Sequence, residues 1–152
     1  MLSDTDLLHI VDATPLVSID LILRNERDEV LLGQRVNRPA KGLWFVPGGR
    51  IHKNERVAEA LQRISKRELG VTISEAKLLG VFDHIYPDNF LGATGVNTHY
   101  VVLGMAAELA GNLRFAADAQ HSELKWWTKA ELLASAVVHQ NTKAYFEERG
   151  EK

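Results

Sequence analysis

The residues best suited to chemistry lie in one charged segment, residues 48–71, which reads GGRIHKNERVAEALQRISKRELGV. The paired glycines Gly48 and Gly49 allow backbone torsions closed to other residues, so a carbonyl there can turn towards a ligand. Glu55 and Glu68 supply carboxylate oxygens, which a hard cation such as Mg²⁺ prefers, commonly together with phosphate oxygens. The two glutamates are thirteen residues apart, or about 140° apart around a helix. Spacing alone therefore does not show which of them binds a metal.

Hydrophobic periodicity around this segment predicts a mixture of helices and strands. Residues 55–69 carry apolar side chains near helical spacing, and Gly70 is a natural stop after them. Thr128, followed three residues later by Glu131, is a capping-box pattern that starts another helix. The remaining expected elements are helices at 3–12 (capped by Ser3 or Asp4) and 139–149, strands at 16–25, 29–36, 77–85, 97–107 and 123–127, and one short strand in the loop 37–50. This order predicts an α/β/α sandwich with a mixed β-sheet, formed by residues 1–152 as a single domain.

Composition narrows the class of protein. The chain has 152 residues, a formal net charge of −2 and no cysteine. Disulfides, thiolate catalysis and Cys-bound zinc are excluded, and nothing in the charge attracts nucleic acid or anionic membrane in general. The acidic N-terminal stretch lacks the features of a signal peptide, and no apolar run approaches the roughly 20 residues of a membrane helix. We therefore expect a cytoplasmic protein without a nucleic-acid or membrane partner.

The charged segment resembles the signature of the Nudix hydrolase family, G-x5-E-x7-R-E-U-x-E-E-x-G-U, in which U is an aliphatic residue. The matching positions are Gly49, Glu55, Arg63, Glu68, Gly70 and Val71. Ile64 and Arg67 stand where the signature has two further glutamates. In the family, carboxylates at and near those positions help to bind several metal ions and can supply the base. Their loss argues against the ordinary Nudix attack at phosphorus.

A longer resemblance points to one branch of the family, the GDP-mannose mannosyl hydrolases. The similar stretches span most of the chain and are residues 14–23, 31–50, 83–90, 98–103 and 119–126. The resemblance implies Mg²⁺-dependent hydrolysis of GDP-mannose, and of GDP-glucose, to GDP and the free sugar, with Mn²⁺ able to replace Mg²⁺. It also implies that water attacks the anomeric carbon with inversion, and that the protein is a homodimer.

The same resemblance implies roles for individual residues. It gives three metal ligands: the carbonyl of Gly48, Glu68 and Gln120. His121 becomes the general base, and Arg35 and Arg50 stabilise the leaving diphosphate. Three more positions contact the substrate or support catalysis: Asp20, His84 and Tyr100.

These residue types suit attack at carbon. The departing GDP gains negative charge, which Mg²⁺ and the planar guanidinium groups of arginine can stabilise. One carboxylate ligand is then sufficient, which accounts for the loss of the other two. Water that attacks an acetal-like carbon needs a base on the face opposite the leaving group, as in inverting glycosidases. A histidine, with an ordinary pKa of about 6.5, suits that task near neutral pH.

Two other functions remain open. One is a Nudix pyrophosphatase that attacks phosphorus and releases a sugar phosphate and a nucleoside monophosphate. The other is a Nudix-fold module that binds a nucleotide sugar without turnover. Some candidate residues also have a structural interpretation: Glu55 supports the loop and the helix N-terminus, and Arg63 pairs with a loop carboxylate or contacts the substrate. We expect four aromatic residues in the core rather than stacked on a nucleobase: Trp44, Phe45, Trp126 and Trp127.

Overall fold

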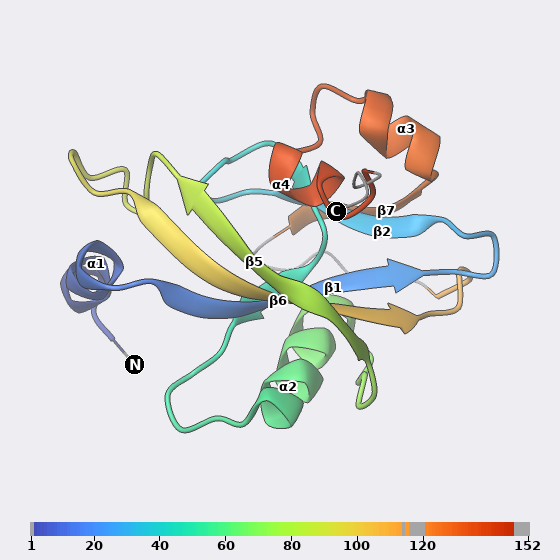
Figure 1. The fold of residues 1–152 in the computed structure, drawn as a ribbon, viewed down its shortest axis with the longest axis horizontal. Coiled ribbons are helices and arrows are strands. Elements are labelled where there is room, and N and C mark those ends of the chain that lie inside the picture. The colour runs from blue at the N-terminus through green and yellow to red at the C-terminus, as the bar shows by residue number, and fades with distance from the viewer. Residues whose placement is uncertain (1, 114, 116–120, 148–152) are drawn as a thin grey trace, which may run out of the picture.

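The structure, a computed structural model, describes residues 2–113, 115 and 121–147 (Figure 1). The strands are β1 (Leu16–Arg24), β2 (Val30–Arg35), β3 (Trp44–Phe45), β4 (Gly48–Arg50), β5 (Lys77–Tyr86), β6 (Thr98–Glu108) and β7 (His121–Trp127). The helices are α1 (Asp4–Ala13), α2 (Val57–Leu69), α3 (Lys129–Ala134) and α4 (Gln140–Lys143). The strands form one sheet with the path β3-β2-β1-β6-β5, in which β4 also pairs with β1, and β7 with β2.

The sheet is mixed, as the sequence predicted. β1 and β6 run parallel, from the pair Leu16–Tyr100 to the pair Arg24–Glu108. The pairs β1–β2, β1–β4, β2–β3, β2–β7 and β5–β6 are antiparallel. Helix α2 covers one face of the sheet, while α3 and α4 lie on the other (Figure 1). The predicted α/β/α sandwich is therefore confirmed.

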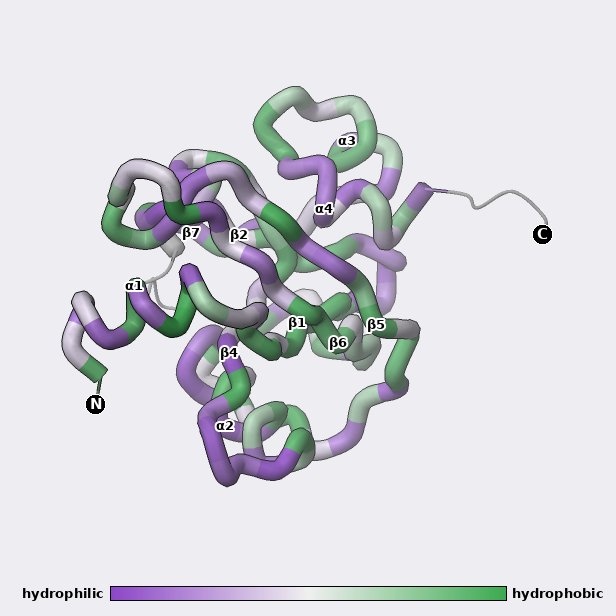
Figure 2. The backbone as a smooth tube through the Cα atoms, turned by 60° about the vertical axis from the view of Figure 1, so that its left-hand side comes forward, coloured by the Kyte–Doolittle hydropathy of each residue, from purple (hydrophilic) through white to green (hydrophobic). Residues whose placement is uncertain are grey.

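Alternating side chains of β1 build the two cores. Ile19 and Leu21 point to one face, where they pack with α2 residues such as Leu61. Ile22 points to the opposite face and packs in a second cluster with Trp127, because successive strand residues project to opposite sides. Figure 2 shows the apolar stretches of β1 and β6 in the middle of the molecule. Of the four aromatic residues expected in the core, Trp44, Phe45 and Trp127 are buried, and Trp126 is partly buried against the α2 cluster.

Most predicted boundaries agree with the structure within two residues. Ser3 caps α1 by accepting a hydrogen bond from the Asp6 amide, and Thr128 and Glu131 form the expected capping box. The loop 37–50 contains two short strands, β3 and β4, where one was expected. In the described part of the chain, no helix has the length and apolar character that crossing a bilayer requires.

The prediction of a helix over 139–149 was wrong in extent over the described residues, because α4 spans only Gln140–Lys143, while residues 148 and 149 lie outside the described residues. After α4 the chain continues in turns with hydrogen bonds between residues three apart. The amide of Tyr145 donates to the carbonyl of Thr142, and the amide of Phe146 donates to the carbonyl of Lys143. Phe146 is buried in the core on the α3 side of the sheet. The side chains of Tyr145 and Phe146 find their partners in the sheet, and this tertiary packing overrides the local helical pattern.

Candidate active site

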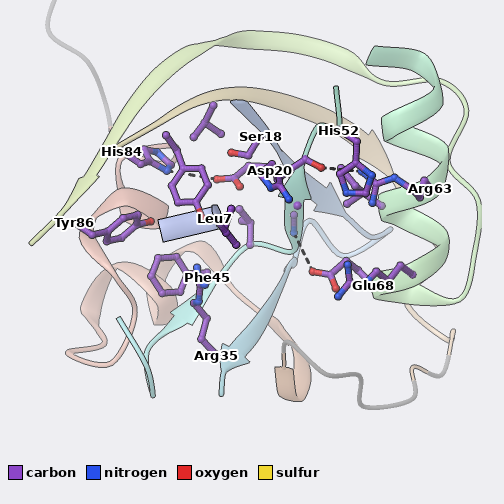
Figure 3. A pocket seen from close by; sticks show the side chains of 18 residues that line it. Leu7, Ser18, Asp20, Arg35, Phe45, His52, Arg63, Glu68, His84 and Tyr86 are labelled. Atoms are coloured by element: carbon purple, nitrogen blue, oxygen red, sulfur yellow. Dashed lines mark hydrogen bonds and ion pairs between the residues drawn. The ribbon is translucent and has the colours of Figure 1, made fainter. Parts of the chain in front are cut away.

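One cavity of about 310 Å³ brings most of the predicted site residues together. Seven of them line it: Asp20, Arg35, Gly48, Arg50, Glu68, His84 and Tyr100. Gln120 lies outside the described residues, and so does the side chain of His121. The backbone of His121 begins β7 and pairs with Arg35 of β2. Figure 3 shows Asp20 in the middle of the cavity, with His84 on one side and His52 and Arg63 on the other.

Gly48 and Glu68 meet where β4 passes the last turn of α2. Gly48 pairs with Asp20 in the sheet, and a Cβ atom at Gly48 would collide with the carbonyl oxygen of Ile19 and lie 2.7 Å from Oδ1 of Asp20. Glycine is therefore required here by close approach. The side chain of Glu68 is buried, and its Oε1 lies 3.4 Å from the amide nitrogen of Gly48. A carboxylate and a piece of backbone thus share one wall of the cavity.

The oxygen atoms that the protein presents here fit a cation that takes its remaining ligands from water and from the substrate. Among the residues that the structure describes, no three His, Cys, Asp or Glu side chains are grouped to hold a metal ion. Mg²⁺ commonly takes one or two carboxylates and completes its shell with water and phosphate oxygens. Buried Glu68, beside the backbone of Gly48 and open to the cavity, fits that arrangement. The described residues do not fit a metal site in which the protein supplies every ligand.

Asp20 carries an unusual carboxyl group. Its side chain is 18% exposed, and its Oδ2 accepts a hydrogen bond of 2.7 Å from the hydroxyl of Tyr145. Burial raises the pKa of Asp20 to about 7, although the Tyr145 hydrogen bond and the charge of Arg35 both lower it. Asp20 therefore changes its charge close to neutral pH, unlike an ordinary carboxyl group.

His84 lies beside Asp20 but does not form an ion pair with it at neutral pH. The Nδ1 atom of His84 is 3.9 Å from Oδ2 of Asp20. Burial and, to a smaller extent, the charge of His139 lower the pKa of His84 to about 4. A neutral imidazole consequently faces the carboxyl group, and the contact is polar rather than ionic.

Two arginines give the cavity its positive side. The guanidinium carbon of Arg35 lies 5.3 Å from the centre of the Phe45 ring, a cation–π arrangement that orients the side chain. Burial raises the pKa of the Tyr100 hydroxyl, while the charges of Arg35 and Arg50 act in the opposite direction. The two arginines, on β2 and β4, therefore act on the same hydroxyl. An anionic ligand such as a phosphate is favoured between them.

Helix α2 lines the cavity with two pairs of residues one turn apart. Arg63 and Arg67 form one pair, and Ile64 and Glu68 form the other. Arg63 binds Glu55 through a hydrogen bond of 2.7 Å, which confirms the expected pairing with a loop carboxylate. Arg67 is exposed at the rim. The described lining of the cavity thus includes four arginines, because Arg63, paired with Glu55, and Arg67 add to Arg35 and Arg50.

Ile64 occupies one of the two positions where the Nudix signature has a glutamate that is missing here. Its side chain is 1% exposed and belongs to the core between α2 and the sheet. A Cβ atom at Gly49 would lie 3.2 Å from Cγ1 of Ile64, so the isoleucine side chain packs tightly against strand β4. The position has therefore become part of the core, where an ionised carboxylate would be costly without a partner.

Sequence reasoning missed several residues of the site. Phe45 was expected only in the core, yet it is both buried and part of the cavity wall. Arg67 was noted only as a departure from the signature, although its spacing of one turn from Arg63 placed both on one helix face. Tyr145 is 125 residues from Asp20, and no local pattern connects the two.

Comparison with known proteins agrees with this architecture. A solved MutT NUDIX hydrolase from Burkholderia pseudomallei superimposes with a TM-score of 0.71, covering 88% of this chain and 96% of the other, at 27% identity. The NUDIX domain of Shewanella oneidensis NrtR, solved with ADP ribose, has a TM-score of 0.62 and covers 90% of both chains. At 23% identity, this second likeness shows the fold alone.

Sequence relatives and a family model extend the comparison. The low-salt glycan biosynthesis protein Agl8 of Haloferax volcanii is 44% identical over 118 residues, which are 76% of this chain and 72% of Agl8. The 8-oxo-dGDP phosphatase NUDT18 of Mus musculus is 30% identical over 120 residues, but this chain spans only 34% of its length. The model of the NUDIX domain matches residues 14–147. The chain therefore belongs to the Nudix hydrolase family.

Proposed function

We propose that this Nudix protein hydrolyses GDP-mannose, and also GDP-glucose, to GDP and the free sugar in a Mg²⁺-dependent reaction. Water attacks the anomeric carbon, and GDP is the leaving group. The observation that carries the proposal is the composition of the cavity wall, in which the buried carboxylate of Glu68 lies beside the Gly48 backbone in a cavity that Arg35 and Arg50 also line. The two signature positions that would add carboxylates hold the core residue Ile64 and the cation Arg67.

That composition suits stabilisation of a leaving diphosphate. Glu68, Gln120 and the backbone carbonyl of Gly48 would hold Mg²⁺, which when bound supplies positive charge to the phosphate oxygens. Arg35 and Arg50 contact the same oxygens as negative charge develops on GDP. Arginine suits this role because its planar fork matches phosphate geometry. The positive side of the cavity, built from two different strands, supports this assignment.

The other groups serve the sugar end. His121 takes the proton from the attacking water, because the usual carboxylates of the family are absent here. Its backbone position opposite Arg35, which lines the cavity, supports this role. Asp20, His84 and Tyr100 also line the cavity, and we assign them to the sugar and to support of the reacting groups. A neutral His84 and a hydrogen-bonded Asp20 can both bind sugar hydroxyls.

Two relatives bear on the choice of substrate. Agl8 is named for glycan biosynthesis, which accords with a substrate that contains a sugar. NUDT18 is named as a phosphatase of 8-oxo-dGDP, which favours the alternative of attack at phosphorus in a nucleoside diphosphate compound. The replacement of both signature glutamates favours the first of these, because a metal cluster rich in carboxylates cannot form at Ile64 and Arg67.

The deciding experiment is hydrolysis of GDP-mannose and GDP-glucose in ¹⁸O-labelled water. Label in the free sugar, with unlabelled GDP, is the expected result. Label in phosphate, with sugar phosphate and GMP as products, would establish the pyrophosphatase instead. Tight binding of GDP-mannose without Mg²⁺-dependent turnover would establish a binding module. Anomeric inversion is checked by proton NMR of the sugar immediately after its release.

A further inference from the structure

The C-terminal segment, residues 137–146, lies behind the wall of the cavity and is hydrogen-bonded to β3 and Val46, where Phe45 and Val46 line the cavity. The amide of Trp44 donates to the carbonyl of Val137 (2.8 Å), and the amide of His139 donates to the carbonyl of Trp44 (3.1 Å). The amide of Val46 donates to the hydroxyl oxygen of Thr142 (3.2 Å). These bonds fasten the segment to β3 and to the residue after it, and so fix where the segment ends.

Tyr145, near the end of this segment, reaches the cavity through Asp20. Its hydroxyl donates a hydrogen bond of 2.7 Å to Oδ2 of Asp20. Asp20 lines the cavity, whereas Tyr145 is not among the residues that line it. Tyr145 therefore binds the carboxyl group of Asp20 from the side away from the cavity, and a ligand in the cavity would contact Asp20 rather than Tyr145.

The ring of Tyr145 lies in a seat formed by two strands. The ring of Phe82 on β5 meets it edge-on, with centres 4.8 Å apart and planes at 86°. On β6, a Cβ atom at Gly104 would lie 3.3 Å from Cε1 of Tyr145, so the absence of a side chain there leaves room for the ring. The seat fixes the ring, and the ring fixes the hydroxyl.

We propose that Tyr145 is a positioning residue that fixes the carboxyl group of Asp20 for a hydroxyl group of the sugar. This inference rests on the proposed function, because it requires a ligand with a sugar beyond the diphosphate. With Oδ2 held by Tyr145, Oδ1 on the Gly48 side remains for the ligand. A fixed acceptor loses less conformational freedom on binding than a mobile one, so removal of the Tyr145 hydroxyl weakens recognition of the sugar.

The test compares ligands with and without the sugar. Binding of GDP-mannose and of GDP is measured by calorimetry in EDTA for the wild type and Tyr145→Phe, which keeps the ring in its seat. GDP-mannose should bind about tenfold more weakly to Tyr145→Phe, the scale of one hydrogen bond to a charged or polar group. The affinity for GDP should change less than about twofold, because GDP does not reach Asp20.

Two further variants separate positioning from general stability. In an Asp20→Ala background, which has no acceptor for the Tyr145 hydroxyl, Tyr145→Phe should cause no further loss of GDP-mannose affinity, since both changes act on one interaction. Thr142→Val also removes a hydrogen bond of the same segment, to the amide of Val46. It should lower the melting temperature but leave the ratio of GDP-mannose to GDP affinity unchanged.

The outcomes distinguish this inference from the proposed function. If Tyr145→Phe weakens binding of both ligands equally, or weakens GDP-mannose binding as much in the Asp20→Ala background as in the wild type, Tyr145 is only structural and the inference fails. If it binds GDP-mannose like the wild type, the inference fails as well. A wild-type protein that binds neither ligand and does not hydrolyse GDP-mannose with Mg²⁺ would overturn the proposed function and with it the inference. Label found in phosphate would overturn only the attack at carbon.

Discussion

Arg63 and Glu55 form a two-pronged ion pair that ties the loop after β4 to helix α2. The Nε and Nη2 atoms of Arg63 lie 2.7 Å and 2.9 Å from the two carboxylate oxygens of Glu55. Nη2 also donates to the carbonyl of Arg50 at 2.8 Å, and Glu55 accepts a hydrogen bond from the amide of His52. Two matching residues of the Nudix signature thus hold the backbone on which Arg50 and Gly48 are displayed.

This ion pair predicts a pH-dependent stability. The hydrogen bond from Arg63 lowers the pKa of Glu55 from 4.5 to about 2. A lowered folded-state pKa adds stability that is present above pH 4.5 and is lost as the pH falls towards 2. Glu55→Gln should cost about 1–3 kcal/mol at pH 7, as for a lost hydrogen bond to a charged group. It should also flatten the decline of stability between pH 4.5 and 2, as measured by urea unfolding.

Glu75→Gln is the matched control for this prediction, because Glu75 is exposed on the chain between α2 and β5. It changes the net charge equally but should leave the acid decline in place. A Glu55→Gln protein whose unfolding free energy falls as steeply as that of the wild type below pH 4.5 would assign the acid sensitivity to other groups.

Local patterns predicted the elements and one half of the site. The segment from Gly48 to Glu68 predicted a pair of glycines, a charged loop and a helix in this order, and the structure brings Gly48 and Glu68 together. The resemblance to the Nudix family pointed to Arg35, Arg50, Asp20, His84 and Tyr100, which come from five different strands. Periodicity alone could not have joined them, because their meeting depends on the strand order of the sheet.

What the sequence did not reveal depends on contacts distant along the chain. Tyr145 was placed inside a predicted helix, and only the tertiary structure shows its bond to Asp20. The raised pKa of Asp20 arises mainly from burial, which no spacing encodes.

Glu68 is expected to be the one carboxylate that binds the metal ion. Glu68→Gln should raise the Mg²⁺ concentration for half-maximal activity by tenfold or more and abolish Mn²⁺ binding in the absence of nucleotide, as followed by electron paramagnetic resonance. The reason is that a neutral amide retains the shape of the side chain but loses its charge. Circular dichroism checks that the variant is folded.

A second glutamate of the same helix provides the control for Glu68. Glu59 lies in the first turn of α2, is exposed, and accepts a hydrogen bond from the amide of Arg56. Glu59→Gln should leave the Mg²⁺ dependence unchanged. Equal Mg²⁺ requirements for Glu68→Gln and the wild type would remove Glu68 from the metal site.

Arg35 and Arg50 are expected to stabilise the leaving GDP. Arg35→Gln and Arg50→Gln should each lower kcat by about 10²-fold or more, because each removes a preorganised charge from the transition state. Lys66→Gln is the control, since Lys66 is exposed in the last turn of α2 and its Nζ bonds to the carbonyl of Gly70. It removes one positive charge outside the cavity and should keep the native rate. Near-native kcat in both arginine variants would exclude them as phosphate contacts.

His121 is expected to be the general base. His121→Gln should lower kcat by about 10²–10⁴, the usual effect of losing a positioned base, with little change in KM, because the base acts mainly in the transition state. The wild-type rate should rise with pH through an ionisation near 6–7, as an imidazole becomes neutral. His9→Gln, which changes an exposed histidine of α1, is the control and should leave both kcat and the pH step intact.

The pH step alone does not identify the base, because the pKa of Asp20 is also raised to about 7. Loss of a proton from either group would raise the rate over the same range. His84 would not produce this step, because burial lowers its pKa to about 4, well below the pH range of the step. Profiles of log kcat against pH for His121→Gln and Asp20→Asn therefore divide the assignments. If His121 is the base, the step disappears in His121→Gln and persists in Asp20→Asn. The reverse pattern, together with native kcat in His121→Gln, would transfer the role to Asp20.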